Sequence, residues 1–148
     1  MQTALLAILG ASAVALPTLP SVDEIRAAVA AAPKCTGADD PKHTAPFCYF
    51  GKDTILGLKE AVTLKVMHYA NGKGQLTLHA TGASPEDCAA HNFTKQNQTI
   101  NVDLSDCISA TTKFTAKYCS DQDAVQLSIS IAHVPVPDIP VTLTSTTC

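Results

Sequence analysis

The sequence predicts a mainly β protein: an antiparallel β-sandwich or small barrel of about six strands, with a short N-terminal helix and three disulfides. Three observations predict this class. After residue 60 the chain alternates repeatedly between apolar and polar side chains, which is the period of half-buried strands and not of helices. The chain contains an even number of cysteines, six. Its 148 residues suit a single domain.

Residues 1–15, MQTALLAILGASAVA, are uncharged and mostly apolar, and they end in the small-x-small pattern at which signal peptidase cleaves. The stretch is too short to span a bilayer. We therefore predict a cleaved signal peptide at residues 1–15, a secreted extracellular protein, and no transmembrane segment in the mature chain. The competing interpretation, an uncleaved anchor, is disfavoured by the length.

Residues 16–33 are predicted to contain a short helix. Ser21 and Glu24 form a capping-box pattern, and apolar residues follow at helical spacing until Pro33 forbids continuation. A helix of this length is marginal alone, so the segment either packs on the domain or belongs to a tail or pro-segment. The disulfide-stabilised β domain is then expected at residues 34–148.

In residues 34–57, prolines and glycines break every period, which predicts an irregular loop. This loop includes an aromatic cluster, which we interpret as the anchor of the loop in the core. The alternative interpretation is a patch that faces an apolar ligand. The residues of this cluster are Phe47, Tyr49 and Phe50.

Six alternating segments follow, and each predicts a strand with one face on a core and one face in water. Asn71-Gly72 predicts a tight hairpin between the first two, and Ser120–Asp123 predicts a turn between the fourth and fifth. The predicted strands are 62–66, 76–80, 100–104, 114–118, 125–131 and 139–143.

The cysteines of an exported chain predict disulfides rather than a metal site, since no Cys-x-x-Cys spacing occurs. Sequential pairing is our expectation among the fifteen pairings that six cysteines allow. It includes a condition: if the last three strands form a simple meander, Cys119 and Cys148 lie about 9–10 Å apart, beyond the reach of a disulfide. The expected pairs are Cys35–Cys48, Cys88–Cys107 and Cys119–Cys148.

Asn92-Phe93-Thr94 and Asn97-Gln98-Thr99 are both acceptor sequences for N-glycosylation, so we predict glycans on Asn92 and Asn97. Two sequons agree with export. Glycans beside a strand also discourage edge-to-edge pairing with another chain.

No sequence pattern indicates catalysis, a metal or a cofactor, and we expect a protein that is not an enzyme. The alternation places His68 and His79 on opposite faces of their hairpin, which argues against a metal pair. Asp121 and Asp123 are too few ligands for calcium, so they are interpreted as a solvated turn.

Residues 133–140, HVPVPDIP, cannot form a regular ladder because proline donates no backbone hydrogen bond. We interpret this segment as a rigid connection between the last two strands. The alternative is an exposed apolar lip, formed by Val134, Val136 and Ile139, that contacts lipid or a partner.

The net charge of −3, with ten Lys and Arg scattered singly, argues against a nucleic-acid partner. The first hypothesis is a secreted, non-catalytic binding module for a lipid or another apolar ligand. The alternative is an extracellular protein-interaction protein such as an effector, inhibitor or surface component. A small secreted hydrolase ranks third. A cavity large enough for an acyl chain would favour the first hypothesis over the second.

Overall fold

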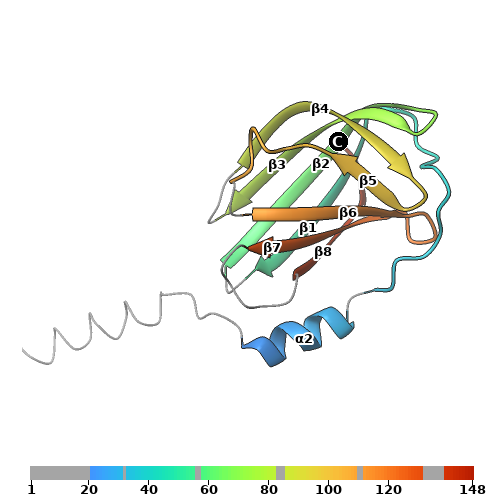
Figure 1. The fold of residues 1–148 in the computed structure, drawn as a ribbon. Helices are drawn as coiled ribbons and strands as arrows, with labels where there is room; N and C mark the ends of the chain where they lie inside the picture. Colours follow the sequence, from blue (N-terminus) through green and yellow to red (C-terminus); the bar gives the residue numbers. More distant parts are fainter. Residues whose placement is uncertain (1–20, 32, 56–57, 83–85, 110–111, 132–138) are drawn as a thin grey trace, which may run out of the picture.

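The computed structural model describes residues 21–31, 33–55, 58–82, 86–109, 112–131 and 139–148 (Figure 1). The predicted signal peptide therefore lies outside the described residues, and so do Val134 and Val136. The described chain forms a closed barrel of eight antiparallel strands, each hydrogen-bonded to the next along the chain. The predicted mainly β class is confirmed and the architecture is a barrel, but the number of strands is eight and not six.

The barrel is an up-and-down meander that closes when the last strand pairs with the first. Each of the six predicted strands overlaps an observed one. The strands are β1 Phe47–Ile55, β2 Leu58–Ala70, β3 Lys73–Gly82, β4 Glu86–Gln96, β5 Thr99–Val102, β6 Thr112–Cys119, β7 Ala124–Ile131 and β8 Ile139–Thr146.

Strand β1 lies inside the segment 34–57, so the prediction of an irregular loop is wrong for its second half. A glycine within β1 was interpreted as a breaker, yet it is needed there for packing. An ideal Cβ at Gly51 would lie 2.5 Å from the carbonyl oxygen of Thr142 on β8. Glycine therefore permits the close approach of β1 and β8 at which the barrel closes.

Strand β4 was not predicted, because a β-bulge interrupts its alternation. Cys88 and Phe93 are both buried, although they are five residues apart, an odd spacing that a regular strand cannot place on one face. The register on β3 shifts between Leu76, which pairs with His91, and Leu78, which pairs with Cys88. The extra residue in β4 restores the inward direction of Phe93.

A second bulge in β2 corrects the prediction for the hairpin histidines. The register shifts between Val66 and His68, so Met67 is the extra residue and His68 pairs with Gln75. His68 is exposed, and so is His79. The prediction that these two histidines lie on opposite faces is therefore wrong, because the bulge moves His68 to the outer face.

Side chains that alternate with more exposed ones, as along most of β3, point into the interior. Eight strands enclose a space just wide enough to be filled by side chains or to hold one small ligand. Lys95 on β4 is the one buried charged residue in the described part of the chain. The largest fully buried residues are Tyr49, Leu76, Val125, Val141 and Leu143.

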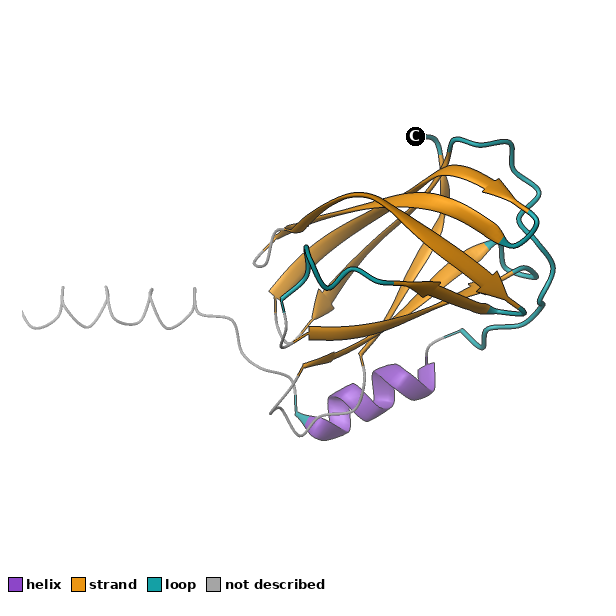
Figure 2. Ribbon diagram, turned by 45° about the horizontal axis from the view of Figure 1, so that its top comes forward, coloured by secondary structure: helices purple, strands orange, loops and turns teal. Residues whose placement is uncertain are grey.

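Helix α2, Val22–Ala31, lies outside the barrel next to β8 (Figure 2). The predicted capping box is present: the N–H of Glu24 donates to Ser21 Oγ (3.1 Å), and the N–H of Ser21 donates to a Glu24 carboxylate oxygen (3.3 Å). The predicted N-terminal helix is only weakly supported, since α2 is short and its contacts with the barrel are few. Among the described residues, no helix has the length and apolarity to cross a membrane.

All six cysteines form disulfides, which confirms three bridges and corrects their pairing. The expected Cys88–Cys107 bridge is confirmed, whereas Cys35–Cys48 and Cys119–Cys148 are wrong. The last three strands do form a meander, which is the condition under which the latter pair is out of reach. The observed bridges are Cys35–Cys119, Cys48–Cys148 and Cys88–Cys107, with Cα–Cα distances of 5.0, 5.2 and 5.5 Å.

Candidate functional site

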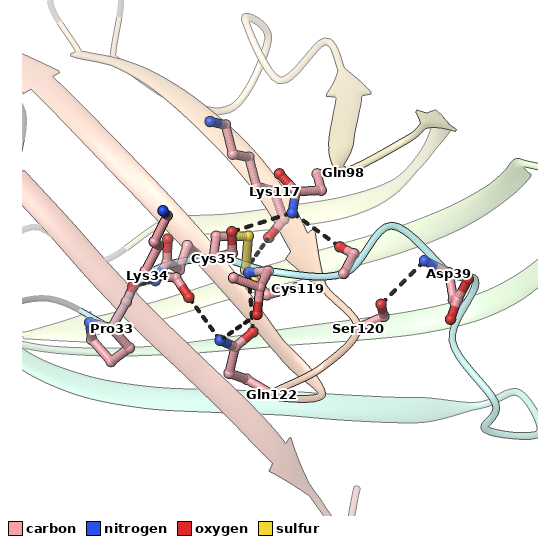
Figure 3. The surroundings of a disulfide bond; sticks show 12 residues. Pro33, Lys34, Cys35, Asp39, Gln98, Lys117, Cys119, Ser120 and Gln122 are labelled. Atoms are coloured by element: carbon pink, nitrogen blue, oxygen red, sulfur yellow. Dashed lines mark hydrogen bonds between the residues drawn. A yellow bond between two sulfur atoms is a disulfide. The ribbon is translucent and has the colours of Figure 1, made fainter.

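One end of the barrel is closed by residues 33–46, which we call the strap. The strap leads from α2 into β1 and crosses the turns that follow β4 and β6 (Figures 1 and 3). Gln98, in the turn after β4, donates from its side-chain amide to the carbonyl oxygens of Cys35 (3.3 Å) and Gly37 (3.0 Å). In the turn after β6, Ser120 Oγ accepts a hydrogen bond from the N–H of Asp39 (3.1 Å). The Cys35–Cys119 bridge adds a covalent link, so the strap is fixed at several points.

The centre of the strap is held by the buried lysine. Lys95 Nζ donates to the carbonyl oxygen of Ala38 and to Asp40 Oδ1, both at 3.2 Å. The hydroxyl of Tyr69 also donates to Asp40 Oδ1 (2.7 Å). The hydrogen bonds from Tyr69 and Lys95 lower the pKa of Asp40, while burial and the bond to Asp40 raise the pKa of Tyr69 to about 12. Lys95 therefore joins the strap to β4, and Tyr69 joins it to β2 through Asp40.

Asp123 forms the second polar centre of this end. Its Oδ1 accepts hydrogen bonds from the hydroxyls of Tyr49 and Tyr118, both at 2.9 Å, and its Oδ2 lies 2.6 Å from His43 Nε2 of the strap. Burial opposes the ionisation of Asp123, but the hydrogen bonds from His43, Tyr118 and Tyr49 outweigh it and lower the pKa. One carboxylate thus joins the strap, β1 and β6.

The same histidine lies near a serine, an arrangement that invites comparison with a Ser-His-Asp triad. Ser145 Oγ is 3.4 Å from His43 Nε2, the nitrogen that also contacts Asp123. A triad needs the carboxylate on one ring nitrogen and the serine on the other, so that the ring can accept the serine proton. With both partners at Nε2, His43 cannot act as that relay. The geometry gives the hydrolase hypothesis no support.

Beneath the strap the interior contains a residual cavity of about 20 Å³, lined mainly by aromatic and aliphatic side chains. Such a volume is close to the minimum that one water molecule requires. The stacked rings of Tyr69 and Phe93, with centroids 5.9 Å apart, occupy the space beside it. The edge-to-face pair of Tyr49 and Tyr118, with centroids 6.1 Å apart, also lines the cavity. Aromatic packing therefore leaves little space beneath the strap.

At the opposite end, His91, Asp106 and Cys107 lie close enough to resemble a metal site. Cys107 is bonded to Cys88 and offers no thiolate. His91 Nδ1 lies 2.5 Å from the carbonyl oxygen of Ala89, and Nε2 lies 2.7 Å from Asp106. These bonds, to Ala89 first and then to Asp106, raise the pKa of His91. The group is therefore best described as an ion pair beside a disulfide.

A large hollow lies on the outer face of the barrel. It has a volume of about 660 Å³, is open to solvent, and extends from the end of β2 to β5. We call it the outer groove. Most of the residues that line it have polar side chains, and the full lining is His68, Ala70, Lys73, Gly74, Gln75, Asn92, Phe93, Thr94 and Asn101.

The predicted apolar contact residues do not form one site. Phe47 and Tyr49 are buried in the interior, which agrees with the interpretation as a core anchor, and Phe50 is half-buried with Lys52 Nζ 5.8 Å from its ring centroid. Ile139 begins β8 and pairs with Ile129 in the ladder. The predicted glycosylation sites are both exposed; Asn92 lies on β4 and Asn97 in the turn after it.

The sequence reasoning missed the residues that hold the strap, namely Asp40, His43 and Lys95. Lys95 had a detectable signal, since it is two residues from Phe93 and shares its inward phase. The β-bulge hides this phase in the sequence, because it interrupts the alternation of β4. His43 and Asp40 lack any local pattern, and only the folded chain brings them to Asp123 and Tyr69.

Acidification is expected to destabilise the strap end. Asp123 and Asp40 have pKa values lowered from the ordinary 3.8, so their contribution to stability is complete above pH 3.8 and is lost as the pH falls through the lowered values. Urea denaturation from neutral pH to below 3.8 measures this loss. In Asp123→Asn the free energy of unfolding is expected to fall less steeply with decreasing pH over the acidic range, which we call the acid limb. An identical acid limb in the variant would contradict the role of Asp123.

Comparisons with protein-family models, with curated proteins and with solved structures each find no match. Because function belongs to sites and not to folds, the barrel alone does not indicate an activity. The function is therefore inferred from the interior, the strap and the surface of this chain.

Proposed function

We propose that the protein is a secreted, non-catalytic interaction protein that contacts an extracellular partner with the outside of a filled barrel. The observation that carries this proposal is the small volume, about 20 Å³, of the cavity that the described residues leave beneath the strap. Pockets for small molecules are typically about 300–1,000 Å³, so the side chains beneath the strap would have to move before this part of the interior held an acyl chain. Three disulfides in a small β domain agree with an oxidising, extracellular environment.

A lipid carrier is the second candidate, because an eight-stranded barrel has the dimensions to enclose one small ligand. The aromatic pairs and the strap disfavour it, since a ligand would have to displace rings that are packed under a covalently fixed segment. The described part of the surface offers little for lipid either. Among the described residues, the large apolar side chains classed as exposed are Val22 and Met67, on separate elements.

The end of the barrel opposite the strap is the more suitable place for a partner. The strap end uses its polar groups internally, in the bonds of Asp40, Lys95 and Asp123. Strands β1, β3, β5 and β7 end at the other end of the meander, where the described residues include 103–109, which follow β5. Loops on a rigid scaffold are where binding residues commonly lie. The Cys88–Cys107 bridge fixes the segment that follows β5 to β4.

The test is a titration with a fluorescent fatty acid. We expect no saturable binding to the native protein. Phe93→Ala serves as the control in a parallel titration with indole, because it opens an apolar cavity under the strap that a small aromatic molecule can enter, and we expect indole to bind the variant and not the native protein. Stoichiometric, saturable binding of the fatty acid by the native protein would overturn the proposal and establish the lipid carrier instead. Native mass spectrometry of the secreted protein provides an independent readout, with a copurifying lipid as the contradicting result.

A further inference from the structure

The outer groove contains a glycosylation acceptor. Asn92, the first residue of the sequon Asn92-Phe93-Thr94, lines the groove, and so does Thr94. We propose that the outer groove holds the first N-acetylglucosamine residues of a glycan attached to Asn92. The glycan would then be an ordered part of the surface, and the groove would be its binding site.

The direction of Asn92 follows from the bulge in β4. In a regular strand that starts from the buried Cys88, the residue four positions later would point inward, and that residue is Asn92. The extra residue between Cys88 and His91 reverses the phase, so Phe93 is buried and Asn92 is exposed. The second bulge, at Met67, moves His68 to the same outer face.

The bulges thus create two polar rows across neighbouring strands. One row consists of His68, Gln75 and Asn92, which pair across β2, β3 and β4. The other consists of Lys73, Thr94 and Asn101, which pair across β3, β4 and β5. Amide, hydroxyl, ammonium and imidazole groups are the donors and acceptors that sugar hydroxyl and acetamido groups bind.

The hydrogen bond of Asn92 is compatible with glycosylation. Gln75 Nε2 donates to Asn92 Oδ1 (3.1 Å). The oligosaccharide is attached to Nδ2, so the amide oxygen can keep this bond after modification. The bond holds the amide against β3, in the groove, and fixes the direction in which the first sugar leaves.

A tethered sugar needs less affinity than a free one. The described surface shows no large aromatic platform for sugar stacking, and the chain contains no tryptophan. A free oligosaccharide would therefore bind weakly. A covalent link converts binding into an intramolecular step with a millimolar or higher effective concentration, so weak polar contacts suffice. This consideration favours the protein's own glycan as the occupant over a soluble carbohydrate.

The other sequon provides the internal control. Asn97 is exposed in the turn between β4 and β5, with a φ of 53°, and it does not line the groove. A glycan on Asn97 would extend from the end of the barrel that the strap closes, where Gln98 binds the strap. The two glycans are therefore expected to differ in order although their acceptors are five residues apart.

The experiment compares the two sites in protein secreted from a eukaryotic host that performs N-glycosylation. Glycopeptide mass spectrometry measures occupancy, and an endoglycosidase then releases the glycans from the folded protein. We expect the Asn92 glycan to be released at least about tenfold more slowly than the Asn97 glycan, which corresponds to about 1.4 kcal/mol of docking free energy. After denaturation the two rates should be similar.

Two variants separate the sites: Thr94→Ala removes the first sequon and leaves the Asn92 side chain in place, and Thr99→Ala removes the second. Gln75→Ala should bring the release rate at Asn92 close to that at Asn97. An unmodified Asn92, or equal release rates at both sites in the folded wild-type protein, would overturn the proposal. The wild-type comparison needs no substitution, so it remains decisive if a variant fails to fold.

Discussion

Replacing Cys35 and Cys119 together by alanine is expected to lower the free energy of unfolding by about 4.5 kcal/mol. The bridge closes a loop of 84 residues, and loss of such a crosslink restores a large conformational entropy to the unfolded chain. The variant also removes the covalent link between the strap and β6, so that hydrogen bonds such as those of Asp39 and Gln98 hold the strap without it. Urea denaturation followed by circular dichroism measures the change.

The matched control is the double replacement of Cys88 and Cys107. That bridge closes a loop of 19 residues, so the chain-entropy relation gives a smaller loss of about 3 kcal/mol. The decisive result is which double variant loses more free energy of unfolding. Native-state strain changes the size of each loss more than it changes their order. A larger loss for the Cys88–Cys107 pair would contradict the assigned role of the Cys35–Cys119 bridge.

Asp123→Ala is expected to cost about 3 kcal/mol, because three hydrogen bonds of about 1 kcal/mol each are lost. The substitution leaves the hydroxyls of Tyr49 and Tyr118 without their acceptor under the strap. It also places alanine at a φ of 46°, in the left-handed region that favours glycine and asparagine. Thermal and urea unfolding measure the effect.

Two controls accompany this variant. Asp121→Ala lies on the same turn, is exposed, and keeps its backbone bond to Thr36, so we expect a change within about 0.5 kcal/mol. Asp123→Asn tolerates the positive φ and keeps one acceptor oxygen, so its effect should be intermediate. Equal losses for Asp121→Ala and Asp123→Ala would show that the network does not stabilise the strap end.

Much of the fold is predictable because most strands obey a simple rule. β7, for example, alternates Val125 and Leu127 with Gln126 and Ser128, and the structure buries the first two. The same rule fails where the backbone departs from a regular strand. β4 has an extra residue at its bulge. A regular alternation would place Cys88 and Phe93 on opposite faces of the strand, whereas both are buried inside the barrel.

Strand β1 was missed for a different reason. Phe47, Cys48 and Tyr49 are buried consecutively, so no alternation is visible. Gly51 was interpreted as a breaker, whereas it is required where β1 approaches β8. Both features arise from the closure of the barrel, a contact between strands far apart in the sequence that local patterns cannot reveal.

The disulfide pairing and the hydrogen bonds of the strap could not be predicted from the sequence for the same reason. Sequential pairing favours Cys35–Cys48, but barrel closure brings the C-terminal residue, Cys148, to β1 and leaves Cys35 beside β6. The charges that hold the strap are likewise distant in the sequence, since Asp40 and Lys95 are 55 residues apart. Their proximity is a property of the closed barrel.

The measurement that tests the central claim most directly is a disulfide map of the unreduced protein, obtained by proteolysis and mass spectrometry. The claim is that a closed barrel is sealed at one end by the strap. It predicts crosslinked peptides that contain Cys35 with Cys119 and Cys48 with Cys148. A peptide that joins Cys35 to Cys48 would contradict it, because the strap would then be tied to its own end and not across the barrel.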